Sequence, residues 1–287
     1  MYVVAGASGN TGKIVAKRLL AAGKKVRAIV RHPDKAKDLA DQGAELVSAD
    51  LGDRGAFEKA LTGATGLYLL SPPDMGAQDF LKERSALLTS VAAAIKSARV
   101  PHTVFLSSIG GHQASGTGII LTTHAGETAL RDAGVGFTAL RAAYFVENWG
   151  SVIPVAKQDG VLPSFLPGNK VMPMVCTVDI GNTAADLLLE GSSAPRVVEL
   201  SGPRDVSPAE VAQTLGKILE KPVSLVEPPL DAVVPTFTGF GISANVAGLF
   251  RDMYAGLASG AVAWQGGSAV ARRGKISLEE TLRALAG

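Results

Sequence analysis

Three glycines spaced three residues apart near the start of the chain offer a site for an anionic ligand. Gly6, Gly9 and Gly12 follow a β-branched run and precede apolar residues at helical spacing, which predicts a strand, a tight turn and a helix. Glycine permits the turn and lets a pyrophosphate approach the backbone at the helix N-terminus, where free N–H groups favour an anion. Polar side chains at the same turn come from Ser8, Asn10 and Thr11.

Two interpretations of this segment are open. A strand-to-helix turn that needs a positive φ and binds nothing would also use glycine, and Val4 stands where a G-x-G-x-x-G motif would have its first glycine. The order of strand, glycines, amphipathic helix and second strand favours a dinucleotide.

The end of the second predicted strand indicates which dinucleotide is expected. Enzymes that hold NAD usually place an acidic residue here for the ribose 2′-hydroxyl, whereas an arginine accommodates a 2′-phosphate. This chain has Arg31, with Lys35 nearby. A planar guanidinium suits phosphate, so the sequence predicts NADP(H), unless Arg31 is only a solvated side chain at a strand end.

Further candidate ligand contacts follow the third, fourth and fifth predicted strands. Asp50 either accepts a hydrogen bond from the adenine amino group or caps the next helix, and Leu51 would pack on the ring. Ser71 and Pro72 begin a loop expected over the cofactor's sugars, and Ser107 lies beside the expected nicotinamide position. Ligands of parallel sheets collect at the carboxyl ends of the strands.

Strand alternates with helix through residue 140, which predicts parallel βαβ units with right-handed crossovers. The fold class expected is therefore α/β, with a doubly wound parallel sheet. After the first strand and helix, strands are predicted at residues 25–30, 44–48, 66–70, 102–106 and 136–140, and helices at 33–42, 53–61, 77–98 and 124–133.

From residue 151 the alternation weakens, so we expect a dinucleotide-binding domain at 1–150 and a smaller α+β lobe for the substrate at 151–287. Strands near 173–176 and 196–200 are expected to return to the sheet, and the glycines and prolines of 155–171 predict a hairpin with turns.

Several capped helices are predicted in the second lobe. Asp179 is the expected N-cap of a helix to residue 190, and Ser207 and Ser277 are expected to cap helices to residues 219 and 285. Residues 223–226 predict a small parallel strand.

Residues 234–260 mix aromatic side chains with glycines, which predicts a lid that closes over a flat, apolar acceptor. The same side chains at helical spacing are equally compatible with ordinary core or with the face of a homodimer.

Composition excludes several partner classes. The 28 Lys and Arg nearly balance the 26 Asp and Glu, so no field attracts nucleic acid or an anionic membrane. No apolar stretch approaches a bilayer span, and no secretory signal is visible at Met1. The single cysteine, Cys176, fits a cytoplasmic protein, and four scattered histidines offer no metal-ligand spacing.

Taken together, these motifs resemble the NmrA-like group of atypical short-chain dehydrogenases/reductases. The glycine loop, Arg31 and Asp50-Leu51 match, as do His124-x-x-Glu127 and Tyr144-Phe145-x-Glu147-Asn148. The resemblance implies a Rossmann-type fold, NADP(H) as cofactor, and either reduction of quinones, triphenylmethane dyes or azo compounds, or redox sensing without turnover.

The chain departs from the Tyr-x-x-x-Lys pair of many short-chain dehydrogenases. If His124 occupies the place of the lysine, the tyrosine's place falls on Ile120, which cannot transfer a proton. An electrophilic aromatic acceptor would need little acid assistance, and this favours a reductase for quinones or dyes; a sensor of NADP(H) is the alternative. His124, Tyr144 and Asn148 are the candidates to contact ribose, carboxamide or acceptor, although His124 could instead bond backbone and Tyr144 could instead be core.

Overall fold

The central sheet of the molecule has eight strands, all parallel. The structure, a computed structural model, describes residues 1–287. Strand order is β13-β10-β6-β5-β4-β1-β2-β3. The strands are β1 (Tyr2–Ala5), β2 (Val26–Val30), β3 (Glu45–Ser48), β4 (Gly66–Leu70), β5 (Thr103–Ser108), β6 (Phe137–Ala142), β10 (Val197–Ser201) and β13 (Val270–Arg273). The predicted doubly wound parallel sheet is confirmed.

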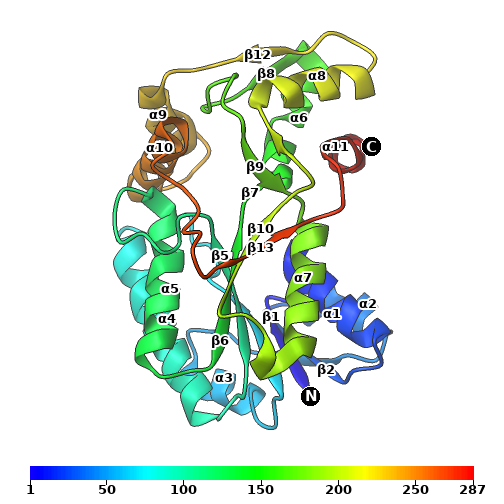
Figure 1. The fold of residues 1–287 in the computed structure, drawn as a ribbon, viewed down its shortest axis with the longest axis vertical. Helices are drawn as coiled ribbons and strands as arrows, with labels where there is room; N and C mark the ends of the chain where they lie inside the picture. The colour runs from blue at the N-terminus through cyan, green and yellow to red at the C-terminus, as the bar shows by residue number, and fades with distance from the viewer.

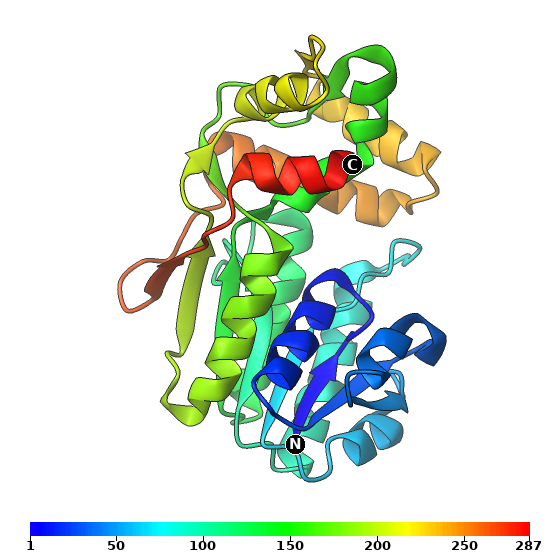
Figure 2. The ribbon, with the colours of Figure 1, turned by 90° about the vertical axis from the view of Figure 1, so that its right-hand side faces the viewer.

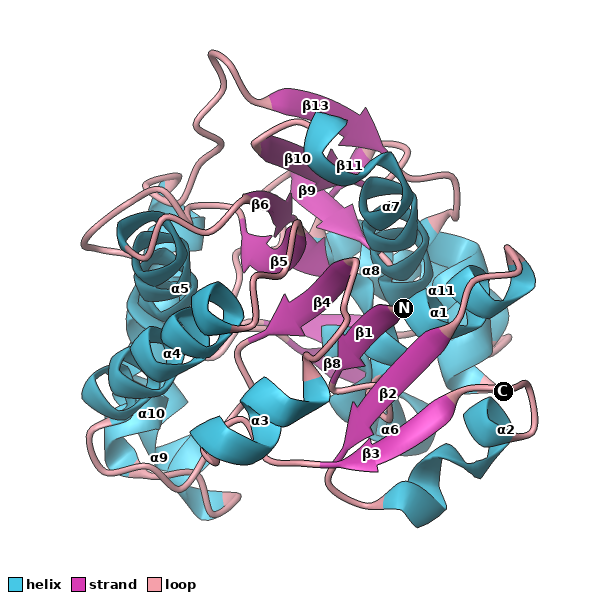
Figure 3. Ribbon diagram, turned by 90° about the horizontal axis from the view of Figure 1, so that it is seen from below, coloured by secondary structure: helices cyan, strands magenta, loops and turns pink.

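Helices cover both faces of this sheet, as Figure 3 shows from below. One face carries α1 (Asn10–Ala21), α2 (Lys37–Ala40) and α7 (Thr177–Glu190), and the other carries α3 (Arg54–Ala60), α4 (Phe80–Ser97) and α5 (Leu121–Asp132). Each layer packs its own apolar cluster against the strands. Burial on both sides explains why the central strands are nearly continuous apolar runs.

A smaller part of the chain lies beyond the carboxyl ends of the strands, at the top of Figure 1 and Figure 2. It has a three-stranded sheet of β7 (Tyr144–Phe145), β9 (Met172–Val175) and β11 (Asp205–Val206), and a pair of β8 (Val161–Pro163) with β12 (Ser224–Val226). Its helices are α6 (Ile153–Asp159), α8 (Pro208–Ile218), α9 (Val233–Gly239), α10 (Ala244–Ser259) and α11 (Leu278–Ala286). Short 3₁₀ turns occupy Pro33–Ala36, Gly118–Ile120, Val146–Ser151, Gly191–Ser193 and Leu230–Ala232.

Several predictions for this second part need correction. The segment near 173–176 does not return to the main sheet, because β9 pairs with β7 and β11, whereas β10 does join it. The stretch expected as a hairpin contains α6 and β8, and β8 pairs in parallel with β12. Strand β13 was not predicted. The division of the chain into two domains stays a prediction.

Two of the predicted helix N-termini are confirmed by the structure, and two others differ from it. Ser207 and Ser277 each form a capping box with the glutamate three residues later, as predicted. The N-cap of α7 is Cys176 and not Asp179, whose carboxylate instead accepts the backbone N–H groups of Lys275 and Ile276. Helix α5 begins at Leu121, so His124 lies inside its first turns. No helix combines the length and apolar character needed to cross a bilayer.

Candidate functional site

A cavity of about 630 Å³ opens at the carboxyl ends of β1, β2, β3 and β4. These strands are neighbours in the sheet, so residues far apart in the sequence meet there. Among the predicted cofactor contacts, those that line this cavity are Gly6, Ser8, Gly9, Arg31, Asp50, Leu51 and Pro72. The cavity has the position and the donor set that a dinucleotide needs.

The glycine loop forms an open backbone cradle. Gly6 has a φ of +64°, and a Cβ on Gly12 would lie 2.4 Å from the Gly6 carbonyl oxygen, so both positions require glycine. The N-cap of α1 is Gly9, which has no side chain to cap the helix. The backbone N–H groups of Asn10, Thr11 and Gly12 therefore donate no hydrogen bond within the chain and remain available to an anion.

Three predicted contacts are placed differently from the others. The side chain of Thr11 is buried, and its Oγ1 accepts a 2.8 Å hydrogen bond from the hydroxyl of the buried Tyr68. Its hydroxyl therefore belongs to the core under the loop, and only its backbone is left for a ligand. Asn10 is exposed and Ser71 half-buried, and neither is among the residues lining the cavity.

Two acidic residues follow β3, Asp50 and Asp53, and the structure shows which of them caps the next helix. Asp53 caps α3 by accepting the N–H of Ala56 at 3.0 Å. Asp50 accepts the N–H of Gly52 at 2.7 Å through Oδ1, which leaves Oδ2 without a partner at the cavity. Asp50 is therefore not the cap, and it stays a candidate for the adenine.

Arg31, the residue predicted to contact a 2′-phosphate, has no partner within the chain. Arg31 is exposed at the end of β2 and forms no ion pair with any carboxylate of the chain. A guanidinium without a protein partner at this cavity can pair with a 2′-phosphate.

One residue of the cavity was missed from the sequence. Arg84 on α4 lines it and approaches the Pro72 carbonyl oxygen at 3.4 Å and the Asp74 carboxylate at 3.5 Å. Its Nε is buried without a partner. An arginine inside a predicted packing helix carries no signal in the sequence that would single it out.

A second cavity, of about 540 Å³, opens where β5 and β6 end. It lies beside the first, because β5 pairs with β4. Of the predicted contacts, Tyr144 and Asn148 line it, together with Ser108. Its apolar wall includes Ile119, Ile120, Phe237, Phe250, Met253, Tyr254 and Leu257, mostly from α9 and α10. The aromatic segment thus lines a cavity, as expected of a lid.

The aromatic rings of this wall pack on one another. The centroid of Phe237 lies 5.0 Å from that of Phe250 and 6.1 Å from that of Phe165, and Phe165 lies 5.6 Å from Tyr254. In an edge-to-face contact the edge of one ring covers one face of the other, so each such pair keeps some of its ring faces uncovered by its partner.

The phenol of Tyr144 is held in its neutral form. Burial raises the pKa of Tyr144 well above its ordinary value, and the neighbouring Tyr254 raises it further. Burial also raises the pKa of Tyr254. Both tyrosines are therefore weak acids there.

The predicted His124 is not among the residues lining either cavity. Its Nδ1 lies 3.2 Å from the carbonyl oxygen of Gly111, and the ring is half-buried. The structure therefore places His124 against the glycine-rich loop.

Comparison with known proteins identifies the family. The NmrA-like family model matches residues 2–258. The chain belongs to the NmrA-like family. The (4-alkanoyl-5-oxo-2,5-dihydrofuran-3-yl)methyl phosphate reductase of Streptomyces griseus is 31% identical to this protein. The match covers 81% of this chain and 78% of that enzyme.

Two further similarities concern quinone reductases. Quinone oxidoreductase 2 of Escherichia coli is 27% identical over 91% of this chain and 89% of its own. The solved structure of an NADPH-dependent quinone oxidoreductase from Escherichia coli, in complex with NADPH, superposes with a TM-score of 0.83 at 25% identity and covers 100% of both chains. The predicted resemblance to the NmrA-like group is confirmed.

A buried ion pair of this NmrA-like chain engages the side chain of Ser107. Arg141 Nε and Nη2 donate to the two carboxylate oxygens of Glu127 at 2.8 and 2.6 Å, and Ser107 Oγ donates to Oε1 at 2.6 Å. Each of the three residues is at most 3% exposed. The contact of Ser107 with a nicotinamide stays a prediction, and its neighbour Ser108 lines the second cavity.

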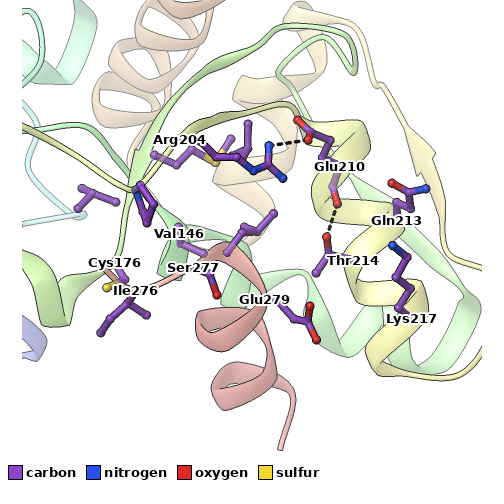
Figure 4. Close-up of a pocket in the computed structure, with 15 residues that line it drawn as sticks. Val146, Cys176, Arg204, Glu210, Gln213, Thr214, Lys217, Ile276, Ser277 and Glu279 are labelled. Carbon is purple, nitrogen blue, oxygen red and sulfur yellow. Dashed lines mark hydrogen bonds and ion pairs between the residues drawn. The ribbon is translucent and has the colours of Figure 1, made fainter. Parts of the chain in front are cut away.

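A third cavity, of about 340 Å³, lies between α8 and α11 and holds none of the predicted residues (Figure 4). Its arginine is already paired, since Arg204 donates to Glu210 at 2.6 Å. Burial raises the pKa of the Cys176 thiol at its inner wall to about 11, so this thiol stays protonated near neutral pH. No group of three or more His, Cys, Asp and Glu side chains is arranged to hold a metal ion.

Proposed function

We propose that this NmrA-like protein is an NADPH-dependent reductase that transfers hydride to an electrophilic aromatic acceptor such as a quinone or a dye. The observation that carries the proposal is the adjacency of two cavities at one edge of the sheet. One has a backbone cradle and an unpaired arginine, and the other has an aromatic wall. The similarity to quinone oxidoreductases and to a reductase of an unsaturated lactone supports it.

Residues of the first cavity would hold the cofactor. The free N–H groups after Gly9 would bind the diphosphate, Arg31 the 2′-phosphate, and Asp50 with Leu51 the adenine. NADPH supplies a hydride from its nicotinamide when it is bound.

Residues of the second cavity would orient the acceptor. Ring faces of Phe237 and Phe250 would stack on a flat molecule, while the hydroxyl of Tyr144 and the amide of Asn148 would fix its polar edge. Holding two reactants at contact distance is the main rate term for such a transfer. The role of His124 stays a prediction, and any proton that a quinone requires would come from His124 or from water.

Turnover with added acceptors tests the proposal. The purified protein is expected to oxidise NADPH faster when menadione or a triarylmethane dye is added. With the same acceptor, NADH should be oxidised more slowly than NADPH. If no acceptor of either kind accelerates NADPH oxidation although NADPH binds tightly, the reductase proposal is wrong.

A non-catalytic sensor of NADP(H) is a second candidate. The observation that favours it concerns Ile120, which lines the second cavity. If His124 takes the place of the lysine in a Tyr-x-x-x-Lys pair, Ile120 takes the place of the tyrosine and cannot donate a proton. Tight NADPH binding with no turnover would favour this role.

A further inference from the structure

The third cavity has no lining residue in common with the other two. Tyr144 and Glu147 line the second cavity, whereas Val146, between them in the sequence, lines the third. The third cavity lies where the small sheet meets α8 and the start of α11 (Figure 4). Its volume of about 340 Å³ is within the range of small-molecule sites, which is roughly 300–1,000 Å³. A ligand here would therefore occupy a site of its own.

The floor of the third cavity is aliphatic. The side chains of Val146, Met174 and Val206 are each at most 4% exposed. The thiol of Cys176 donates to Asp179 Oδ2 at 3.5 Å and accepts the Asp179 backbone N–H at 3.4 Å, so its hydrogen bonds are already made. No aromatic side chain lines the cavity, which therefore has no ring face on which a flat molecule could stack. An aliphatic chain is the ligand group that such a floor would bury.

Three of the four charged side chains that line the cavity already have partners. Arg204 Nη1 donates to Glu210 Oε1 at 2.6 Å, as Figure 4 shows. The Glu279 carboxylate accepts a hydrogen bond from Arg283 Nη2 at 2.7 Å. Lys217 forms no ion pair with any carboxylate of the chain. The rim thus presents one uncompensated positive charge above the aliphatic floor.

The spacing along α8 explains how this cation reaches the cavity. Glu210, Gln213, Thr214 and Lys217 follow one another at steps of three and four residues, so they share one face of the helix, and this face borders the cavity (Figure 4). Lysine side chains keep their ammonium group in water and lay their methylene groups along apolar surface. Lys217 can therefore extend the aliphatic wall and hold its charge at the rim.

We propose that the third cavity binds an amphipathic anion, a carboxylate with an unbranched aliphatic chain, whose head group pairs with Lys217 and whose chain covers Met174 and Val206. The inference goes beyond the proposed reductase function and does not depend on it, because no residue of this cavity is assigned to the cofactor or to the acceptor. Burial of the chain drives binding, and the ion pair at the rim selects the sign of the head group.

Calorimetry of the full chain with decanoate tests the proposal. We expect decanoate to bind. Decylammonium, which has the same chain and the opposite charge, should bind at least about fivefold more weakly. If decanoate gives no heat of binding, or if decylammonium binds as tightly as decanoate, the proposal is wrong.

Lys217→Gln tests the charge. The side chain is exposed, so the change should not affect folding, and the Kd for decanoate should rise about threefold to fivefold because an exposed ion pair is lost. Lys82→Gln is the matched control, since Lys82 is an exposed lysine of α4 that lines none of the three cavities. It should bind decanoate like the wild type. An equal rise in both variants would show a general effect of net charge and would overturn the role of Lys217.

Thr214→Trp tests the location. Thr214 lines the cavity, and its hydroxyl bonds only the Glu210 carbonyl oxygen of its own helix. An indole at this position would occupy space that the chain needs, so the heat of binding should disappear. Wild-type affinity in this variant would mean that decanoate binds elsewhere, such as in the second cavity, and would overturn the proposal. Urea denaturation shows whether Thr214→Trp is folded, and if it is not, Lys217→Gln decides the proposal by the same calorimetry.

Discussion

The hydroxyl of Ser243 donates a 2.6 Å hydrogen bond to the carbonyl oxygen of Ala77. Ser243 is the N-cap of α10, and Ala77 belongs to the loop between β4 and α4. Two further bonds join the same segments, from Ser243 N–H to the Met75 oxygen at 2.8 Å and from Phe80 N–H to Asn245 Oδ1 at 3.0 Å. Helix α10 is thus joined by hydrogen bonds to the loop whose residues Pro72, Pro73 and Asp74 line the first cavity.

Ser243→Ala should loosen this connection and remove the cap that accepts the Val246 N–H. We expect a loss of about 1 kcal/mol in the free energy of unfolding, measured by urea denaturation, because the cap and one connecting bond are lost. The KM for the acceptor should rise severalfold, more than the Kd for NADPH. Thr238→Ala removes an exposed hydroxyl of α9 that bonds only its own helix, and it should change neither constant. An unchanged acceptor KM in Ser243→Ala would show that these bonds do not hold the lid.

Arg31→Ala tests the choice of cofactor. A hydrogen bond to a charged group contributes about 1.5–3 kcal/mol, so calorimetry should show the Kd for NADPH rising by about tenfold to a hundredfold and that for NADH changing little. Arg54→Ala, at an exposed arginine on α3, is the charge-matched control. Equal losses for both cofactors would remove the reason to assign the 2′-phosphate to Arg31.

Gly12→Ala tests the cradle. The added Cβ would lie 2.4 Å from the Gly6 carbonyl oxygen, so the loop must move, and we expect at least tenfold weaker NADPH binding. Overpacking should also lower the free energy of unfolding by about 1–3 kcal/mol, as measured by urea denaturation. Gly55→Ala on α3, where the nearest atom to an added Cβ is 3.6 Å away, should bind NADPH like the wild type. Wild-type affinity in Gly12→Ala would contradict a dinucleotide at this loop.

The buried thiol of Cys176 predicts a pH dependence of stability. Burial raises its pKa from 9.0 to about 11 in the folded protein. The folded state therefore holds the proton more tightly than the unfolded state, and this stabilisation is complete below about pH 9 and is lost as the pH rises through about 11.

Urea denaturation from pH 8 to 11 measures this effect. Over that range the free energy of unfolding of the wild type should fall by about 2–3 kcal/mol more than that of Cys176→Ala. The reason is that a shift of one pKa unit corresponds to about 1.4 kcal/mol. At pH 8 the folded thiol should also react far more slowly with iodoacetamide than the denatured thiol does. Parallel stability profiles for the two proteins would show that the thiol is not perturbed.

The sequence brought together most residues that line the first cavity because its signals are local. The glycines, Arg31 and Asp50 each follow a strand, and a parallel sheet brings the carboxyl ends of its strands to one edge. The sequence pointed to Ser107, whereas Ser108 lines the second cavity. Neighbouring strand residues face opposite sides, and the buried partner of Ser107 is Glu127, 20 residues away, so the sequence does not show which serine faces a cavity.

Long-range pairings account for the parts of the fold that were not predicted. Strand β13 has only four residues, two of them arginines, and is mostly exposed, so no apolar alternation marks it. Its place beside β10 depends on tertiary contacts. The proline and the apolar residues of β9 are compatible with either sheet, and only the packing of the second part selects β7 and β11 as its neighbours.

The position of β13 at the border of the main sheet has a consequence for truncated chains. Its residues cover one side of β10, pairing Val198 with Val270 and Ser201 with Arg273. A fragment cut by a protease before Val270 would uncover the N–H and C=O groups along that side of β10, an apolar and buried strand. An exposed edge strand can pair with a strand of another molecule, so these fragments should aggregate under conditions in which the whole chain does not.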